Sequence, residues 1–305
     1  MWIARGLGSF PPDVTATVIA LGTFDGVHLA HRAILGIAVA RAHELGMPAV
    51  ACTFEPHPMD VLQPGRAPLP IATLDDRLAW IGETGVDGAV VLAFTRHLAS
   101  MEPEAFVKDV LLDALRAREV VVGYNHTFGR GARGNARLLD ELGAELGFRT
   151  HIVPPYEVDA VPVSSSEIRS ALRAGDVERA ARFLGRPYTI VGEVVSGAGR
   201  GRTLGFPTAN VQPALTLLLP GGVYACRAEF ADERHDAVVN IGVRPTFGER
   251  TLYVEAHLLD FSGDLYGRRV RLAFLRRLRD ETRFPSVEAL RAQISRDIED
   301  ARRAL

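Results

Sequence analysis

The sequence predicts an α/β domain with an open parallel sheet, followed by a small antiparallel β-barrel domain with a C-terminal helix. In the first 185 residues, apolar strand runs alternate with helical patterns, as they do in an open parallel sheet. After that point, short alternating strands are separated by Gly/Pro turns. The length of 305 residues is enough for two domains of ordinary size. We therefore predict domains of residues 1–185 and 186–305.

The first predicted domain is made of buried apolar strands with amphipathic helices between and after them. The strands are expected at Val18–Leu21, Ala49–Phe54, Ala89–Phe94, Val120–Gly123 and His151–Val153. The helices are expected at Ala30–Leu45, Leu74–Ile81, Pro103–Leu115, Ala136–Leu146, Ser165–Ala174 and Asp176–Leu184. Ser164 and Glu167 form a capping-box pattern, which predicts that the helix from Ser165 begins there.

The second predicted domain begins where the pattern changes, near Gly185–Pro187. Its strands are short and are bounded by turn residues, which is typical of an antiparallel barrel. They are expected at Tyr188–Val195, Val223–Phe230, Ala237–Ile241, Leu252–Leu259 and Val270–Leu275. Ser286–Ala304 has apolar residues on one side and predicts a closing amphipathic helix.

Composition excludes several classes of protein. Apolar residues make up 47% and charged residues 24%, which indicates a globular chain. A net charge of −2 provides no basic field for nucleic acid or acidic lipid. No apolar run approaches the roughly 20 residues of a membrane helix, and the first ten residues lack a signal-peptide pattern. Two distant cysteines argue against a disulfide framework and fit a cytoplasmic location.

Lys108 is the only lysine of the chain, and no phosphate-binding P-loop motif surrounds it. ATP would therefore have to be bound by other means. Gly22–His31 (GTFDGVHLAH) follows the first predicted strand and enters the first predicted helix. A helix start offers free N–H groups and a positive dipole end to an anion.

His28 and His31 point from one face of that first turn, because they are three residues apart. Two histidines alone would favour ordinary surface or capping roles. Their place after a strand and a glycine-rich turn favours phosphate binding instead, because two imidazoles suit a triphosphate whose α-phosphorus gains negative charge during transfer.

This turn resembles the H-x-G-H signature of the nucleotidylyltransferase superfamily, whose Rossmann-like domain binds ATP without a P-loop lysine. Three further segments resemble the FAD synthetase domain of bacterial riboflavin kinase/FAD synthetases. They are Thr53–Pro58 (TFEPHP), Val122–Gly129 (VGYNHTFG) and Ser164–Arg169 (SSSEIR). The resemblance spans essentially the whole chain, with its motifs in the family's order. It implies adenylylation of FMN by ATP to give FAD and pyrophosphate.

The resemblance also implies roles for individual residues. His28 and His31 would contact the ATP phosphates, and Asn125 would lie near the nucleotide and its metal. A second helix start would cradle the phosphates through Ser164, Ser165 and Arg169, although a capping box alone needs no ligand. Two positions depart from the family: Ala30 replaces the usual Gly, and Ser166 replaces a common Thr.

Gly197–Asn210 (GAGRGRTLGFPTAN) is the most specific stretch of the sequence. It is not a Rossmann fingerprint, because an arginine stands where the third glycine belongs and no helix follows. Hydroxyl and amide oxygens at Thr208 and Asn210 suit Mg²⁺. Backbone N–H groups and guanidinium groups suit nucleotide phosphates, and the candidates are Gly199, Gly201 and Arg202.

Thr251–Leu259 alternates cleanly between apolar and polar residues, which places Glu255 on the polar face of a strand. A carboxylate on a rigid strand is well placed to act as a general base, although an isolated strand glutamate is more often merely solvated. With the preceding loop, Val254–Phe261, Asn240–Phe247 and Asp264–Gly267 resemble the riboflavin kinase domain.

That second resemblance implies that Thr208 and Asn210 hold Mg-ATP. Glu255 would take the proton from the terminal ribityl hydroxyl of riboflavin, which attacks the γ-phosphorus. The resulting hypothesis is a bifunctional, cytoplasmic enzyme that uses Mg²⁺ and ATP on riboflavin and FMN. Its partners are small molecules, with neither nucleic acid nor membrane, and assembly into a homo-oligomer is left open.

Two alternatives remain. A monofunctional riboflavin kinase with an impaired adenylyltransferase domain would be consistent with Ala30. A non-catalytic sensor that binds flavin or nucleotide would not need a general base, so Glu255 argues against it.

Overall fold

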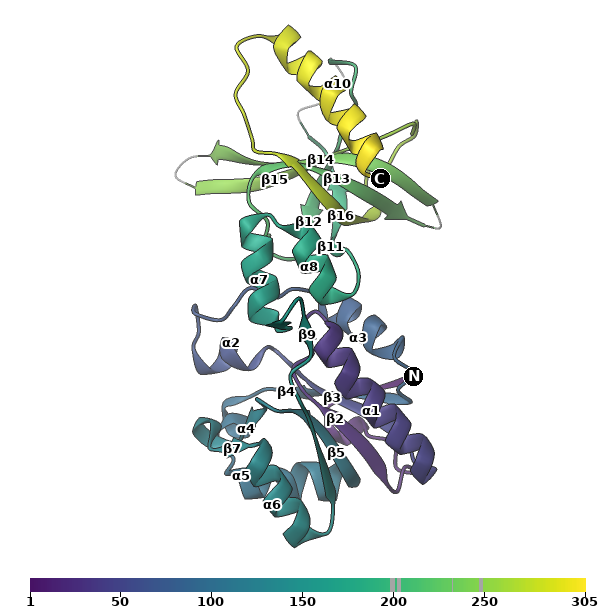
Figure 1. The fold of residues 1–305 in the computed structure, drawn as a ribbon, viewed down its shortest axis with the longest axis vertical. Helices are drawn as coiled ribbons and strands as arrows, with labels where there is room; N and C mark the ends of the chain where they lie inside the picture. The colour runs from purple at the N-terminus through teal and green to yellow at the C-terminus, as the bar shows by residue number, and fades with distance from the viewer. Residues whose placement is uncertain (198–200, 202–203, 232, 247–248) are drawn as a thin grey trace. The chain divides into compact units, whose positions relative to one another are not determined.

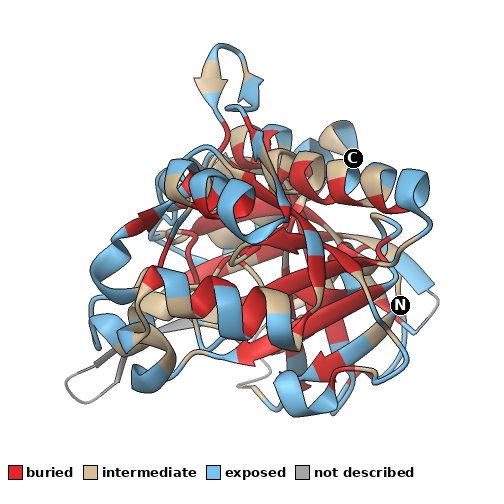
Figure 2. Ribbon diagram, turned by 90° about the horizontal axis from the view of Figure 1, so that it is seen from below, coloured by how far each residue is buried: buried red, intermediate tan, exposed pale blue. Residues whose placement is uncertain are grey.

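The computed structural model describes the chain except for residues 198–200, 202–203, 232 and 247–248 (Figure 1). The chain divides into two compact units, one of Met1–Leu69 with Thr73–Ser164 and the other of Pro70–Ala72 with Ser165–Leu305. Each unit has its own sheet and its own buried core. Figure 2 shows that the buried residues follow the strands and one side of the helices.

The first unit is built on a six-stranded parallel sheet in the order β1-β4-β3-β2-β5-β8. The strands are β1 (Trp2–Arg5), β2 (Thr17–Leu21), β3 (Ala49–Glu55), β4 (Gly88–Ala93), β5 (Ala117–Gly123) and β8 (Arg149–Val153). The helices are α1 (Leu29–Leu45), α2 (Pro58–Leu62), α3 (Leu74–Gly82), α4 (Arg96–Ser100), α5 (Pro103–Ala105), the π-helix η2 (Phe106–Ala114) and α6 (Ala136–Leu146). Two small hairpins pair β6 (Thr127–Phe128) with β7 (Gly134–Asn135) and β9 (Glu157–Val158) with β10 (Val161–Pro162).

Both faces of this sheet are covered. Every residue of β2 is buried, and alternate residues face different cores. Val18 and Ala20 join one apolar cluster, whereas Ile19 and Leu21 join the other. A strand that is buried on both faces has a continuous apolar sequence rather than an alternating one. The prediction of a Rossmann-like parallel α/β domain is confirmed.

The second unit is a closed six-stranded barrel in the order β11-β12-β15-β14-β13-β16, and every pair of neighbouring strands is antiparallel. Helices α7 (Ser165–Ala174) and α8 (Val177–Leu184) precede the barrel, and α10 (Val287–Ala304) follows it. The strands are β11 (Tyr188–Val195), β12 (Ala209–Pro213), β13 (Gly222–Phe230), β14 (Glu233–Thr246), β15 (Glu249–Leu258) and β16 (Arg269–Arg279). The predicted barrel with its C-terminal helix is confirmed.

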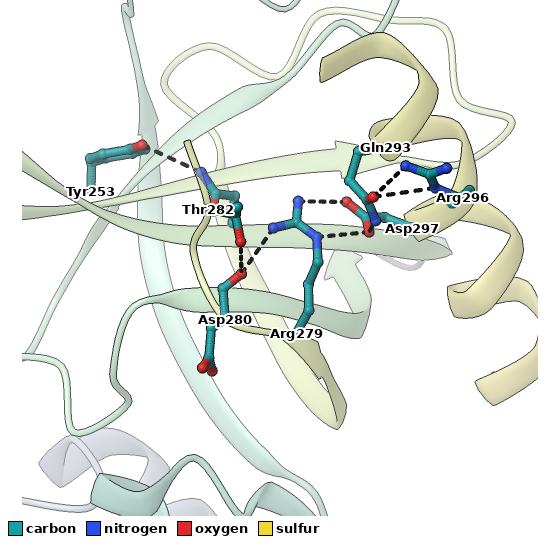
Figure 3. A network of polar contacts seen from close by, with 8 residues as sticks. Tyr253, Arg279, Asp280, Thr282, Gln293, Arg296 and Asp297 are labelled. Carbon is teal, nitrogen blue, oxygen red and sulfur yellow. Dashed lines mark hydrogen bonds and ion pairs between the residues drawn. The ribbon is translucent and has the colours of Figure 1, made fainter. Parts of the chain in front are cut away.

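The C-terminal helix is attached to the barrel by an ion pair and by apolar packing. Arg279 at the end of β16 donates two hydrogen bonds to the Asp297 carboxylate, at 2.9 and 2.8 Å, and Gln293 donates a third at 2.8 Å (Figure 3). Asp297 is buried, so these hydrogen bonds take the place of water around its carboxylate. At the other end of the barrel unit, α8 packs against β16 and β11.

Several elements differ from the sequence expectation, and the short elements α2, α4, β6, β7, β9 and β10 were not predicted. Strand β1 was not predicted; it is only four residues long, and only Ala4 of its residues is buried. Strand β12 was not predicted either, since its polar residues and Pro213 are typical of a loop. The helix expected at Pro103–Leu115 is a short α-helix that continues as a π-helix. An extra residue per turn changes the backbone but keeps the apolar side of the segment buried.

Each unit carries one cysteine, Cys52 on β3 and Cys226 on β13, and both are free thiols without exposed surface. Burial raises the pKa of Cys52 to about 12 and the pKa of Cys226 well above its usual value. Among the described residues, no helix has both the length and the apolar character required to cross a membrane.

Candidate functional site

Polar residues gather at the carboxyl edge of the parallel sheet. Strand β2 lies between β3 and β5. The chain leaves β2 toward His28, leaves β3 at Glu55 and leaves β5 toward Asn125. The strand order reverses between β2 and β5, which is the topological switch point where open α/β sheets bind ligands. His28 and Asn125 therefore follow the two strands that flank this point.

His28 is the N-cap of the 17-residue helix α1, and its Nδ1 accepts a hydrogen bond from the His31 backbone N–H at 3.3 Å. In the neutral ring the proton then lies on Nε2, which leaves that nitrogen as a donor. The two imidazoles are stacked, with ring centroids 3.6 Å apart and planes 15° from parallel. His28 therefore has the capping role that was the simpler interpretation of the sequence. Capping uses Nδ1, so it is compatible with donation from Nε2 to an anion.

The turn before His28 is buried and strained. Phe24 and Val27 have positive φ angles of 48° and 38°, which non-glycine residues rarely adopt, and neither side chain is exposed. The edge of the Phe24 ring lies against His31, with centroids 5.3 Å apart. Such backbone strain persists only where surrounding contacts fix it, and it is concentrated at functional sites.

Arg77 of α3 is a residue that the sequence reasoning missed. It is 4% exposed and donates to the Thr23 carbonyl at 3.0 Å and to the Phe54 carbonyl at 3.1 Å. Its third partner is the Glu55 carboxylate at 2.6 Å. The buried Thr53 hydroxyl also donates to the Thr23 carbonyl, at 2.9 Å. Arg77 thereby fastens the turn that leads to His28 to the end of β3.

The remaining residues predicted for this site are found in different environments. Asn125 is exposed in the turn after β5. The neighbouring His126 is buried at Nε2, and burial lowers its pKa to about 4. Ser164 ends the first unit, whereas Ser165 and Arg169 lie on α7 in the second unit, where Arg169 is 5% exposed.

In the barrel, three polar residues form a row across neighbouring strands. Glu255 on β15 lies opposite Asn210 on β12 and opposite Asn240 on β14. Residues directly opposite in a sheet share a face. Val254 and Ala256, which alternate with Glu255, are buried, so the row lies on the outer face of the barrel. Asn240 also donates to the Tyr253 hydroxyl at 3.4 Å.

Two glycines of the loop before β12 pack directly against the predicted metal ligands. A Cβ on Gly197 would lie 2.0 Å from Nδ2 of Asn210, and one on Gly201 would lie 2.9 Å from Oγ1 of Thr208. A side chain at either position would therefore displace one of these groups. Gly199 and Arg202 fall outside the described residues.

His257 holds the segment that carries Thr208. Its Nδ1 lies 2.8 Å from the Pro207 carbonyl oxygen, and the edge of its ring lies against Phe206, with centroids 5.8 Å apart at 89°. A carbonyl only accepts, so Nδ1 carries the proton and donates. The alternating pattern of the strand placed His257 beside Glu255, but it gave no indication of this contact.

Comparisons with known proteins agree with the two-part architecture. The model of the FAD synthetase family matches residues 11–167, and the model of the riboflavin kinase family matches residues 184–305. A bifunctional riboflavin kinase/FMN adenylyltransferase of Pseudomonas fluorescens is 40% identical over 99% of this chain and 97% of its own length. A protein of the same name from Bacillus subtilis is 38% identical over 93% of this chain and 91% of its own.

A solved structure also matches over the full length. It is described as a macrolide-efflux protein from Streptococcus pneumoniae, has a TM-score of 0.91 and 31% identity, and covers 99% of each chain.

Proposed function

Because the chain belongs to the bifunctional riboflavin kinase/FMN adenylyltransferase family, we propose that two separate groups of residues carry its two reactions. The chain phosphorylates riboflavin to FMN with ATP and adenylylates FMN to FAD with a further ATP. One observation supports the assignment of each reaction to its own unit. The polar groups lie at the carboxyl edge of the sheet in one unit and around Glu255 in the other.

Adenylylation is assigned to the sheet edge. There the FMN phosphate oxygen attacks the α-phosphorus of ATP, and pyrophosphate leaves. His28, the N-cap of α1, would donate from Nε2 to the phosphates, and His31 would contact them as well. Asn125 would contact the nucleotide from the neighbouring turn. Ser164, Ser165 and Arg169 remain proposed phosphate ligands on the strength of the resemblance alone.

Phosphorylation is assigned to the outer face of the barrel. Glu255 would accept the proton of the terminal ribityl hydroxyl as that oxygen attacks the γ-phosphorus, and ADP leaves. The amides of Asn210 and Asn240 flank the carboxylate, which supports a polar site at this place. Gly199, Gly201 and Arg202 are proposed to bind the nucleotide phosphates.

Mg²⁺ is the metal proposed for the kinase site. Thr208 and Asn210 present hydroxyl and amide oxygens two residues apart on an extended segment, and hard oxygen donors are what Mg²⁺ prefers. The side chains of Asn210 and Thr208 lie where a Cβ on Gly197 or Gly201 would collide with them, which supports the assignment. Bound there, the metal would neutralise charge on the β- and γ-phosphates.

A product assay tests the proposed function and its alternatives. The purified protein is incubated with riboflavin, ATP and MgCl₂, and the flavins are separated chromatographically. We expect both FMN and FAD. FMN alone would support the monofunctional kinase, and the absence of both would support the sensor. Omission of MgCl₂ in the presence of chelator should abolish FMN formation if the metal assignment is correct.

The boundary at residues 185 and 186 also stays a proposal, and two fragments test it. Fragment 186–305 contains the whole barrel and α10, whereas fragment 165–305 adds α7 and α8, and α8 packs against β16 and β11. We expect both fragments to make FMN and no FAD. If only the longer fragment is folded and active, the kinase domain begins at α7 and the proposed boundary is wrong.

A further inference from the structure

The backbone at Thr208 lies just outside the regular ladder of the barrel. Strand β12 pairs with β15 from Ala209 opposite Ala256 onward. Thr208 is the next residue outward, so β-pairing with β15 does not hold it. The next residue of β15 is His257, and its side chain makes the contact that the ladder lacks, a hydrogen bond to the Pro207 carbonyl at 2.8 Å.

That carbonyl belongs to the peptide plane that also contains the nitrogen of Thr208. Peptide groups are planar, so fixing the oxygen fixes the orientation of the backbone entering Thr208. Phe206 orients the imidazole by its edge-to-face contact, and its own N–H donates to the Gly201 carbonyl at 2.9 Å. His257, Phe206 and Gly201 thus form a connected set around Thr208.

We propose that His257 is a positioning residue of the kinase reaction, acting through the Pro207 carbonyl to place Thr208 and Asn210 for Mg-ATP. The inference rests on the proposed metal role of those two residues. It concerns the nucleotide side of the site, since His257 reaches the segment that carries Thr208. Binding of riboflavin and the reaction in the other unit should be independent of it.

Steady-state kinetics of riboflavin phosphorylation by the full chain test this inference in four variants. His257→Leu removes the donor at similar size, and His257→Asn keeps an N–H donor near the position of Nδ1. His235→Leu is the matched control, a barrel histidine whose side chain contacts Glu233, Phe230 and Phe261. Thr208→Ala reports separately on the metal assignment. FMN adenylylation and thermal unfolding are measured for each variant.

We expect His257→Leu to raise the KM for Mg-ATP about two- to tenfold, the net effect of one hydrogen bond, with the riboflavin KM and adenylylation unchanged. His257→Asn should restore most of the affinity, and His235→Leu should have none of this effect. The inference is overturned if His257→Leu leaves the KM for Mg-ATP unchanged while Thr208→Ala raises it. It is also overturned if His257→Leu only lowers the melting temperature and kcat. If Thr208→Ala changes neither the KM for Mg-ATP nor kcat, the proposed metal role of Thr208 is wrong, and the inference that rests on it is overturned too.

Discussion

The two units hold their candidate functional groups in different ways. In the first unit the candidate groups lie on turns beyond the strand ends, where no ladder fixes them. Side chains reach back to hold these turns, through the Arg77 contacts and the His28 cap. In the barrel, Glu255 and Asn210 are members of paired strands, so the register itself places them side by side. The placement of His28 therefore depends on side-chain hydrogen bonds from other segments, whereas the placement of Glu255 beside Asn210 depends on the strand register.

Glu255→Gln should show the largest effect, because it removes the reactive group and leaves the strands paired. We expect FMN formation to fall roughly 10²–10⁴-fold, the usual contribution of a positioned base. Adenylylation of supplied FMN should be unchanged, as measured by FAD formation in the same preparation. Near-normal phosphorylation of riboflavin would remove Glu255 from the mechanism.

Arg77→Met should remove the hydrogen bonds that hold the turn before His28 to the end of β3, and it changes no predicted ligand. The turn before His28 would lose a charged donor, and displacement of a reactive group by about 1 Å can cost on the order of 10²-fold in rate. We expect kcat/KM for adenylylation to fall roughly 10–10²-fold and the first unit to be destabilised, with riboflavin phosphorylation unchanged. Arg137→Met, at an exposed arginine of α6, is the matched control. Equal effects of the two substitutions on adenylylation would contradict the proposal that Arg77 holds the turn before His28 in place.

Glu119→Gln should separate stability from catalysis in the first unit. Glu119 lies near the amino end of β5 and is 6% exposed. Its carboxylate accepts two hydrogen bonds from Arg41, each 2.8 Å, and one from His151 at 2.6 Å. These contacts, Arg41 first, lower the pKa of Glu119 to about 2. The lowered pKa means that the folded state favours the ionised carboxylate, so the cluster stabilises the fold at neutral pH.

The sign of the pH dependence follows from the lowered pKa. The stabilisation is complete above the ordinary pKa of a glutamate and is lost as the pH falls toward about 2. Melting curves at pH 7 should therefore show a large deficit for Glu119→Gln, and the deficit should shrink as the pH is lowered below about 4.5. A deficit that stays constant over this range would exclude the ion cluster as its cause.

Ala30→Gly should have the smallest effect. Ala30 lies between the two histidines in the first turn of α1 and is partly buried. A methyl group at this position would crowd a phosphate bound at the turn but would also stiffen the turn, and each effect would be on the order of 1 kcal/mol. We expect kcat/KM for ATP in adenylylation to change less than about tenfold, in either direction. If wild type makes no FAD and Ala30→Gly restores it by orders of magnitude, the chain itself is a monofunctional kinase.

The fold could be predicted from the sequence wherever burial leaves a pattern. The continuous apolar run of β2 and the alternation around Glu255 each indicate their own type of sheet. Strand β12 left no such pattern, because Val211 is its only buried residue. Its strand conformation comes from pairing with the preceding strand β11 and with β15, which is separated from it in the sequence by β13 and β14.

The residue types of the candidate site could be predicted from the sequence, but the contacts that hold those residues in place could not. Glycine-rich turns and a strand glutamate are visible in the sequence alone. The acceptors of Arg77 come from two distant segments, and Asn210 comes to lie opposite Glu255 only when β12 pairs with β15, which is not its neighbour in the sequence. Such contacts depend on tertiary geometry, for which a single sequence gives no local signal.

The two buried cysteines can report on the local unfolding of each unit, because each unit contains one of them. A thiol reagent can modify Cys52 only when the parallel sheet unit opens, and Cys226 only when the barrel does, because neither side chain is exposed and the thiolate is suppressed in both. Alkylation followed by peptide mass spectrometry would therefore give two separate opening rates from one untagged sample. A ligand that slows modification at one cysteine alone would identify the unit in which it is bound.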